Sequence, residues 1–216
     1  MEFYHLMARG VDKRTIVQDD HDRARFVHDL YVFNDTAPAQ HPKQPGRSSG
    51  NHARTRLVDI HSFCLMENHY HLLVSENEEN GIARFMKKLN MGYTKYFNER
   101  YARSGALWQG KYRKVHIERD AHFMYIPFYI HLNPLDYTNS TWRKGGVGDV
   151  ASTLESLNAY RWSSHLDYLG KKNFPSLIST KEIAPLLGSP KEYTATIARI
   201  IRDPFQGAAS ASIEFD

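Results

Sequence analysis

Apolar residues recur in this chain with two different periods, and the order of the two periods constrains the fold most strongly. Segments rich in β-branched and aromatic residues predict strands, and they cover residues 2–9, 55–66, 69–75 and 112–118. Segments with apolar residues at intervals of three and four predict helices, and they cover residues 20–33 and 80–103. The order is that of a βαββαβ unit. We therefore expect an α+β fold, in which a mostly antiparallel sheet carries its helices on one face.

The rest of the chain completes the predicted organisation. A third helix is expected over 120–132, before an Asn-Pro pair that ends it. Residues 35–53 are rich in proline, glycine and serine, which predicts a flexible surface loop. The predicted domains are 1–137, with that loop as an insertion, and a mostly helical C-terminal extension over 138–216 with a loose tail. In the extension, short helices are expected near residues 153–160, 180–187 and 190–202.

Composition sets only broad limits on function. Hydrophobic residues make up 41% of the 216 positions, which excludes wholesale disorder. No apolar run approaches the roughly 20 residues that cross a bilayer, so no membrane partner is expected. Cys64 is the one cysteine and the N-terminus lacks the pattern of a signal peptide, so we expect a cytoplasmic protein. The net charge of +4 favours nucleic acid only weakly.

A pair of histidines supplies the first candidate site. His69 and His71 are two apart in a predicted strand, so their side chains share a face, about 7 Å apart at the backbone. Tyr70 between them faces the other side of the sheet. Two such imidazoles can bind one divalent ion, but such pairs are also common on solvated sheets. A metal site therefore needs a third ligand and a group to act on.

The third predicted helix offers both. Tyr129 and Asn133 are four residues apart, so a phenol and an amide lie one above the other on a helix. If this helix packs near the histidine pair, Asn133 can complete the metal shell while Tyr129 reaches a bound phosphate. The alternative is that Tyr129 is a core aromatic and Asn133 ends the helix. Pro127 removes a backbone hydrogen bond within the helix and predicts a kink there.

Several short motifs, in order, resemble one known family. They resemble the single-tyrosine transposases of the His-hydrophobe-His (HUH) class, specifically the REP-associated tyrosine transposases and the IS200-like transposases. The matching pieces are Tyr4-His5, Arg9-Gly10, Asp22 with Arg25-Phe26, residues 68–74, 96–98, 105–112, 129–134 and 160–164.

The resemblance implies a ferredoxin-like sheet and a specific reaction. It implies that His69, His71 and Asn133 bind Mg²⁺ or Mn²⁺, and that Tyr129 is the nucleophile. The expected activity is cleavage and rejoining of single-stranded DNA through a 5′-phosphotyrosine intermediate, at repeated palindromic sequences that form hairpins. Some relatives are dimers, so the resemblance leaves a homodimer open.

Basic residues gather in one stretch, which suggests where DNA binds. Such a cluster can neutralise phosphates, and aromatic residues between the cations can stack on unpaired bases. A solvated helix face above a core of aromatics is the other interpretation, and for Tyr93, Phe97 and Trp108 we expect the core. The candidate DNA-binding residues are Arg9, Arg84, Lys87, Lys88, Lys95, Arg100, Arg103, Lys111, Arg113 and Lys114.

Two other function classes stay open at this level. A transposase-derived protein could bind nucleic acid without catalysis, and binding without metal-dependent cleavage would support that hypothesis. An unrelated metallohydrolase could use the same histidines with further ligands from Asp59, His61 and Glu67, although these form no recognised ligand spacing.

Overall fold

The computed structural model describes residues 1–38, 54–118, 120–139, 141–145 and 147–204. The predicted loop over 35–53 and the predicted tail therefore lie mostly outside the described residues. No described helix is both long and apolar enough to cross a bilayer.

A four-stranded antiparallel sheet forms the centre of the molecule. Its strands are β1 (Phe3–Arg9), β2 (Val58–Leu65), β3 (His69–Glu76) and β4 (Arg113–His116). They lie in the order β2-β3-β1-β4, and β1 pairs with both β3 and β4. Each strand–helix–strand unit thus skips one position in the sheet, which is the ferredoxin-like arrangement. The predicted α+β fold class is confirmed.

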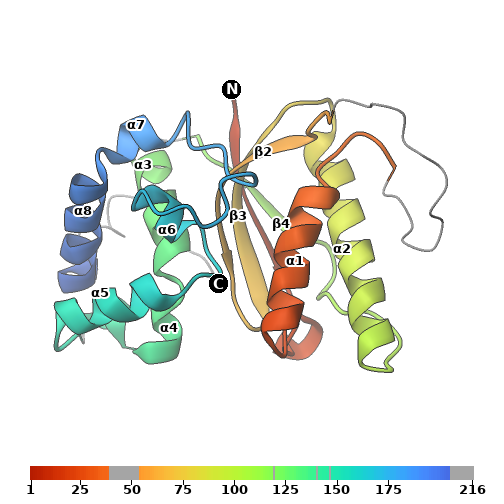
Figure 1. Cartoon of the computed structure of the whole chain (residues 1–216), viewed down its shortest axis with the longest axis horizontal. Helices are drawn as coiled ribbons and strands as arrows, with labels where there is room; N and C mark the ends of the chain where they lie inside the picture. The colour runs from red at the N-terminus through yellow and green to blue at the C-terminus, as the bar shows by residue number, and fades with distance from the viewer. Residues whose placement is uncertain (39–53, 119, 140, 146, 205–216) are drawn as a thin grey trace.

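Two helices cover one face of the sheet. These are α1 (Asp20–Val32) and α2 (Gly81–Arg100), which lie together on the same side of the strands in Figure 1. Their buried side chains meet Tyr70, whose ring is 4.8 Å from that of Phe26. As predicted, Tyr70 faces away from the two histidines, and Tyr93, Phe97 and Trp108 are buried.

The opposite face carries the third helix and the C-terminal extension (Figure 1). Helix α3 (Asp120–Leu132) contacts β2 and β3, and it runs through Pro127 as one helix. The predicted placement of helices on one face therefore describes α1 and α2 alone. The extension contains the 3-10 turn Trp142–Lys144 and helices α4 (Leu135–Thr138), α5 (Val150–Ala159), α6 (His165–Tyr168), α7 (Ala184–Leu187) and α8 (Pro190–Arg202).

A buried hydrogen-bond network ties α3 to the extension. The hydroxyl of Tyr193 on α8 lies 2.8 Å from Nδ1 of His131 on α3 and 2.8 Å from Nδ1 of His165 on α6. The other ring nitrogen of His131 lies 2.7 Å from the Ser164 hydroxyl. Because all four side chains are buried, their polar groups depend on one another. Helix α3 is thus held from behind by the extension, while its other side meets the sheet.

Candidate functional site

Strand register decides which side chains share the face under α3. In the antiparallel pairing, Arg9 lies opposite His69, and Met7 lies opposite His71 on one side and Arg113 on the other. Directly opposite residues point to the same side of a sheet. Arg9, Arg113 and both histidines therefore project from one face, and this is the face toward α3.

The two histidines lie close together on that face. Their ring centroids are 4.9 Å apart and the ring planes are nearly perpendicular. Nδ1 of His69 lies 2.6 Å from the Asn68 side-chain oxygen, which leaves Nε2 of His69 for another partner. Burial lowers the pKa of His69 to about 4, and the neighbouring Arg9 charge lowers it further. The ring is therefore neutral at pH 7 and can act as a ligand.

His5 holds the second histidine of the pair. Nε2 of His5 lies 2.9 Å from Nδ1 of His71, and the two rings are stacked 5.1 Å apart. Both side chains are 2% exposed. Burial lowers the pKa of His5 to about 3 and that of His71 well below its usual value. One neutral ring donates to the other, so His71 is oriented by a partner and keeps Nε2 for a ligand.

Tyr129 and Asn133 both lie at this site. The Tyr129 ring centroid is 5.6 Å from that of His71 and 6.0 Å from that of His5. Nδ2 of Asn133 donates to the Tyr129 carbonyl at 2.8 Å, so the amide oxygen Oδ1 points outward from the helix. Burial raises the pKa of Tyr129 to about 12. The phenol is thus protonated at pH 7 and needs help to become a nucleophile.

Arg143, from the turn after α4, completes the cluster. Its guanidinium carbon lies 5.1 Å from the Tyr129 ring centroid, and its Nη2 donates to Oδ1 of Asn133 at 3.3 Å. Asp136 holds this arginine through Nε and Nη2, each at 3.2 Å. The Arg143 charge acts to lower the pKa of Tyr129 and so opposes the effect of burial. Arg143 thereby links the predicted nucleophile and the predicted third ligand.

The donor set fits a divalent metal ion. The contacts with Asn68 and His5 leave Nε2 of His69 and Nε2 of His71 as ligand atoms. The third is Oδ1 of Asn133, which here accepts from Arg143. All three are neutral, so an ion bound by them would keep its full charge for an anionic substrate. Imidazole suits transition ions and amide oxygen suits harder ions, so the mixed set is compatible with both Mn²⁺ and Mg²⁺.

A second group of metal-type side chains lies elsewhere. Ligand atoms of Asp19, His21 and Asp22 lie within 4.8 Å of one another near the start of α1. Arg100 already donates to all three, at 2.6 to 3.1 Å. A guanidinium thus supplies the positive charge that a cation would bring. We interpret this group as a structural ion-pair cluster that joins α1 to α2.

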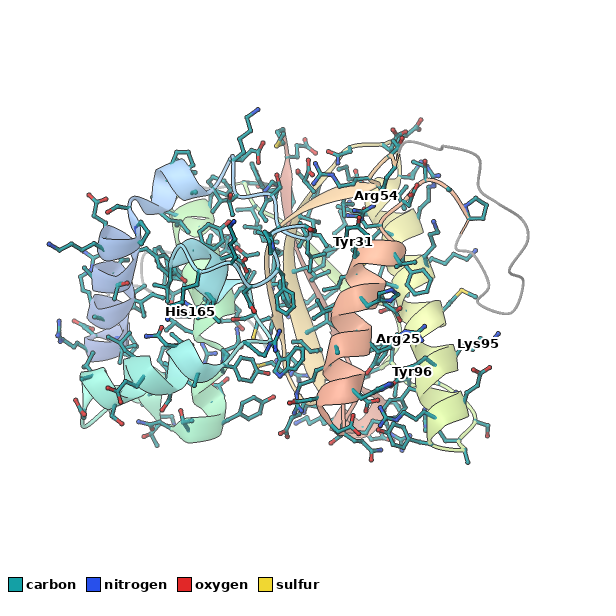
Figure 2. The ribbon with its side chains drawn as sticks, viewed as in Figure 1. Arg25, Tyr31, Arg54, Lys95, Tyr96 and His165 are labelled. Carbon is teal, nitrogen blue, oxygen red and sulfur yellow. The ribbon has the colours of Figure 1, made fainter. Side chains whose placement is uncertain are left out.

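The predicted DNA-binding residues separate into two regions. Those of α2 lie on the helix layer, across the sheet from the histidines, and Figure 2 shows Lys95 there, far from His165 in the opposite layer. Several of these cations are used inside the chain: Lys88 donates to the Ala37 carbonyl, Arg103 to Asn98, and Arg100 to Asp19. Among the predicted set, register places Arg9 and Arg113 on the histidine face.

Two of the additional ligands of the metallohydrolase hypothesis, His61 and Asp59, are engaged in other contacts. His61 is buried with Nδ1 at 3.0 Å from the Ser179 carbonyl and Nε2 at 2.9 Å from the Ser75 hydroxyl. Asp59 forms a salt bridge with Arg56. The structure therefore offers no support for these two as further ligands.

Sequence motifs did not reveal the roles of two residues in this cluster. His5 lies 66 positions before His71 in the chain, and no local spacing links them. Arg143 lies in the extension, for which no role was predicted. If the pairing of β1 with β3 had been known, alternation along β1 would have placed His5 on the same face as His71, two residues from Met7, which lies opposite His71. The position of Arg143 depends on how the chain turns after α4.

Comparison with known proteins identifies a family for part of the chain. Residues 43–133 match the family model described as "Transposase IS200 like". This segment contains the histidine pair, Tyr129 and Asn133, and the matched family is one of those that the motifs resemble. No curated protein matches the chain. One similar solved structure is a REP-associated tyrosine transposase bound to a REP hairpin, with a TM-score of 0.47 and 11% identity, covering 82% of this chain and 85% of that chain.

Proposed function

From the match of residues 43–133 to the family model of the IS200-like transposases, we propose that this protein is a metal-dependent transposase that cleaves and rejoins single-stranded DNA. Its proposed substrate is a strand that folds into a hairpin. The observation that carries the proposal is the convergence of side chains from two distant parts of the chain. The Tyr129 ring of α3 lies against His71 of β3, which is beside His69. Asn133, at the end of α3, is joined to this cluster through Arg143 and the Tyr129 carbonyl.

The proposed reaction uses Tyr129 as nucleophile. Its Oη forms a bond to the scissile phosphorus as the bond from phosphorus to O3′ breaks, which leaves a 5′-phosphotyrosine and a free 3′-hydroxyl. The phenol loses one proton and the leaving oxygen gains one, so the step is balanced. A second 3′-hydroxyl reverses the step and joins new ends, because a phenolate is a good enough leaving group.

Each neighbouring side chain has a part in this reaction. His69, His71 and Asn133 would hold the divalent ion, which when bound neutralises charge on the scissile phosphate. His5 and Asn68 fix the two imidazole rings. Arg143 lies over the Tyr129 ring and favours its phenolate through its charge.

A covalent adduct tests the proposal directly. The protein is incubated with Mn²⁺ and a hairpin-bearing single strand labelled on the 3′ side of the cleavage point, and denaturing gels detect labelled protein. We expect an adduct with the wild type, none with Tyr129→Phe, and an adduct near the wild-type level with Tyr125→Phe, one helical turn earlier. An adduct that persists in Tyr129→Phe would refute the choice of nucleophile.

Binding without catalysis is the second candidate, and one contact favours it. Oδ1 of Asn133 accepts a hydrogen bond from Arg143, so a metal ion must displace that contact to use the oxygen. If the contact holds, the protein binds hairpin DNA and forms no adduct in Mn²⁺ or Mg²⁺. Equal DNA affinity with and without metal, together with no cleavage, would select this candidate.

A further inference from the structure

Arg9 occupies a position that the proposed metal site and nucleophile leave unexplained. It is the last residue of β1 and lies opposite His69 in the strand pairing, on the face toward α3. Its backbone is fixed, because the Arg9 carbonyl accepts from Gln109 and the next residue, Gly10, donates to the Asn68 carbonyl at 2.8 Å. Strand β1 therefore presents this side chain beside the histidine pair.

The Arg9 side chain has a buried donor with no acceptor. Its Nε is shielded from solvent and has no hydrogen-bond partner. No carboxylate in the part of the chain that the structure describes forms a salt bridge with it. A half-buried guanidinium with an unsatisfied N–H is costly, unless an acceptor outside the chain satisfies it.

Charge at the site also calls for an anion. Arg143 shares the site, but Asp136 balances its charge through two hydrogen bonds. Arg9, which lies opposite His69, has no such carboxylate partner among the residues that the structure describes. One bound anion beside Arg9 would balance the positive charge of its guanidinium.

We propose that Arg9 is the residue that binds the phosphodiester to be cleaved, by donating its Nε–H and guanidinium N–H groups to the non-bridging oxygens of the phosphate placed against Tyr129. This inference rests on the proposed function and adds a catalytic residue to it. The planar guanidinium suits two phosphate oxygens at once and transfers no proton, so Arg9 binds and positions the phosphate while Tyr129 supplies the nucleophile.

Replacing the DNA phosphates one at a time tests the proposal by binding alone, without cleavage. Hairpin-bearing strands are made with one neutral methylphosphonate each, at successive positions, and their affinity is measured in EDTA for the wild type, Arg9→Gln and Arg9→Lys. We expect one position at which neutralisation weakens wild-type binding roughly 10-fold or more and leaves Arg9→Gln unaffected. We call this difference in sensitivity between the wild type and a variant the coupling of Arg9 to that phosphate. Arg9→Lys keeps the positive charge but lacks the Nε–H group, so the methylphosphonate at that position should weaken its binding less than it weakens wild-type binding.

Two further measurements make the outcome decisive. Lys191→Gln, an exposed cation on α8, should keep the full wild-type sensitivity, and thermal melts show whether each variant is folded. The cleavage point is mapped separately in Mn²⁺. Coupling at the mapped phosphate supports the proposal, whereas coupling at another phosphate or at none overturns it. If no cleavage occurs, the proposed function fails, while coupling at one position still assigns Arg9 to a phosphate.

Discussion

Two hydrogen bonds determine which nitrogen atoms of the histidine pair remain for a ligand. Asn68 is hydrogen-bonded to Nδ1 of His69, and His5 is hydrogen-bonded to Nδ1 of His71. His71 is buried and His69 is half-buried, and neither ring can rotate without losing its partner. At the scale of single residues, His5 therefore matters for the site although it is not one of the proposed ligands.

Replacement of His5 should weaken metal binding. His5→Phe keeps a ring stacked on His71 and removes the hydrogen bond, so we expect Mn²⁺ affinity to fall roughly 10- to 100-fold. Calorimetric titration with Mn²⁺ measures this directly. His116→Phe, on the exposed edge strand β4, is the control and should bind as the wild type does. Wild-type affinity in His5→Phe would show that the contact does not orient His71.

The rate of adduct formation should rise with pH. Burial raises the pKa of Tyr129 to about 12, so the phenolate is a minor form at pH 7 and its fraction grows tenfold per pH unit. We therefore expect the single-turnover rate at saturating Mn²⁺ to rise with the phenolate fraction from about pH 6.5 to about pH 8.5. Arg143→Gln should be slower at each pH, because it removes a charge that lowers this pKa. A flat profile would mean that the proton is not lost in the rate-limiting step.

At the scale of elements, the junction after β1 decides where Arg9 and β3 meet. Gly10 donates to the Asn68 carbonyl, and a Cβ atom at this position would lie 2.3 Å from the Arg14 carbonyl oxygen. Only glycine lets the chain pass this close, so the strand pair and the turn before His69 depend on it.

Gly10→Ala should therefore destabilise the protein. The backbone around Arg14 must move to accept the methyl group, and we expect a loss of about 1–3 kcal/mol in the free energy of unfolding. Urea denaturation followed by tryptophan fluorescence measures it. Gly148→Ala, where a Cβ atom meets nothing within 4 Å, should stay close to the wild type. Equal stability of the two variants would contradict the close approach.

At the scale of the whole molecule, the sheet separates two layers with different chemistry. The α1–α2 layer carries ion pairs and exposed cations, and the α3 layer carries neutral, buried histidines. Figure 2 shows this separation, with Arg25, Lys95 and Tyr96 in one layer and His165 in the other. If the proposed function holds, the DNA strand that reaches Tyr129 follows the α3 side of the sheet.

The buried histidines predict acid sensitivity of the metal-free protein. Burial lowers the pKa of His165 to about 4, that of His5 to about 3, and that of His131 well below its usual value. The unfolded chain takes up these protons near pH 6.5 and the folded chain does not. The free energy of unfolding is therefore highest above about pH 6.5 and falls on acidification. Each such histidine lowers it by about 1.4 kcal/mol per pH unit.

Thermal melts in EDTA at a series of pH values from about 5 to 8 check this. The melting temperature should fall below pH 6.5 and stay level above it. His28→Gln, which removes an exposed histidine, should retain the same profile. A melting temperature that rises on acidification would show that the histidines gain rather than lose stabilising partners.

The fold was predictable from local patterns. The alternating residues of β3 and the three- and four-residue spacing of α2 depend only on neighbours in sequence, and both elements appear with boundaries close to those expected. The side toward which Tyr70 points followed from the period of a strand. The strand expected over 112–118 is also present, as the shorter β4. The side of the sheet on which α3 packs depends on long-range contacts, and it was not predicted.

The sequence by itself determined the order of strands and helices, the shared face of His69 and His71, and the spacing that puts Asn133 one turn after Tyr129. These follow from backbone periods, which are local. Tertiary structure alone decided that His5 holds His71, that Arg143 links Tyr129 to Asn133, and that Arg9 lies beside the pair with an unsatisfied donor. Those contacts join residues far apart in the chain, because strand pairing and burial bring them together and no spacing encodes them.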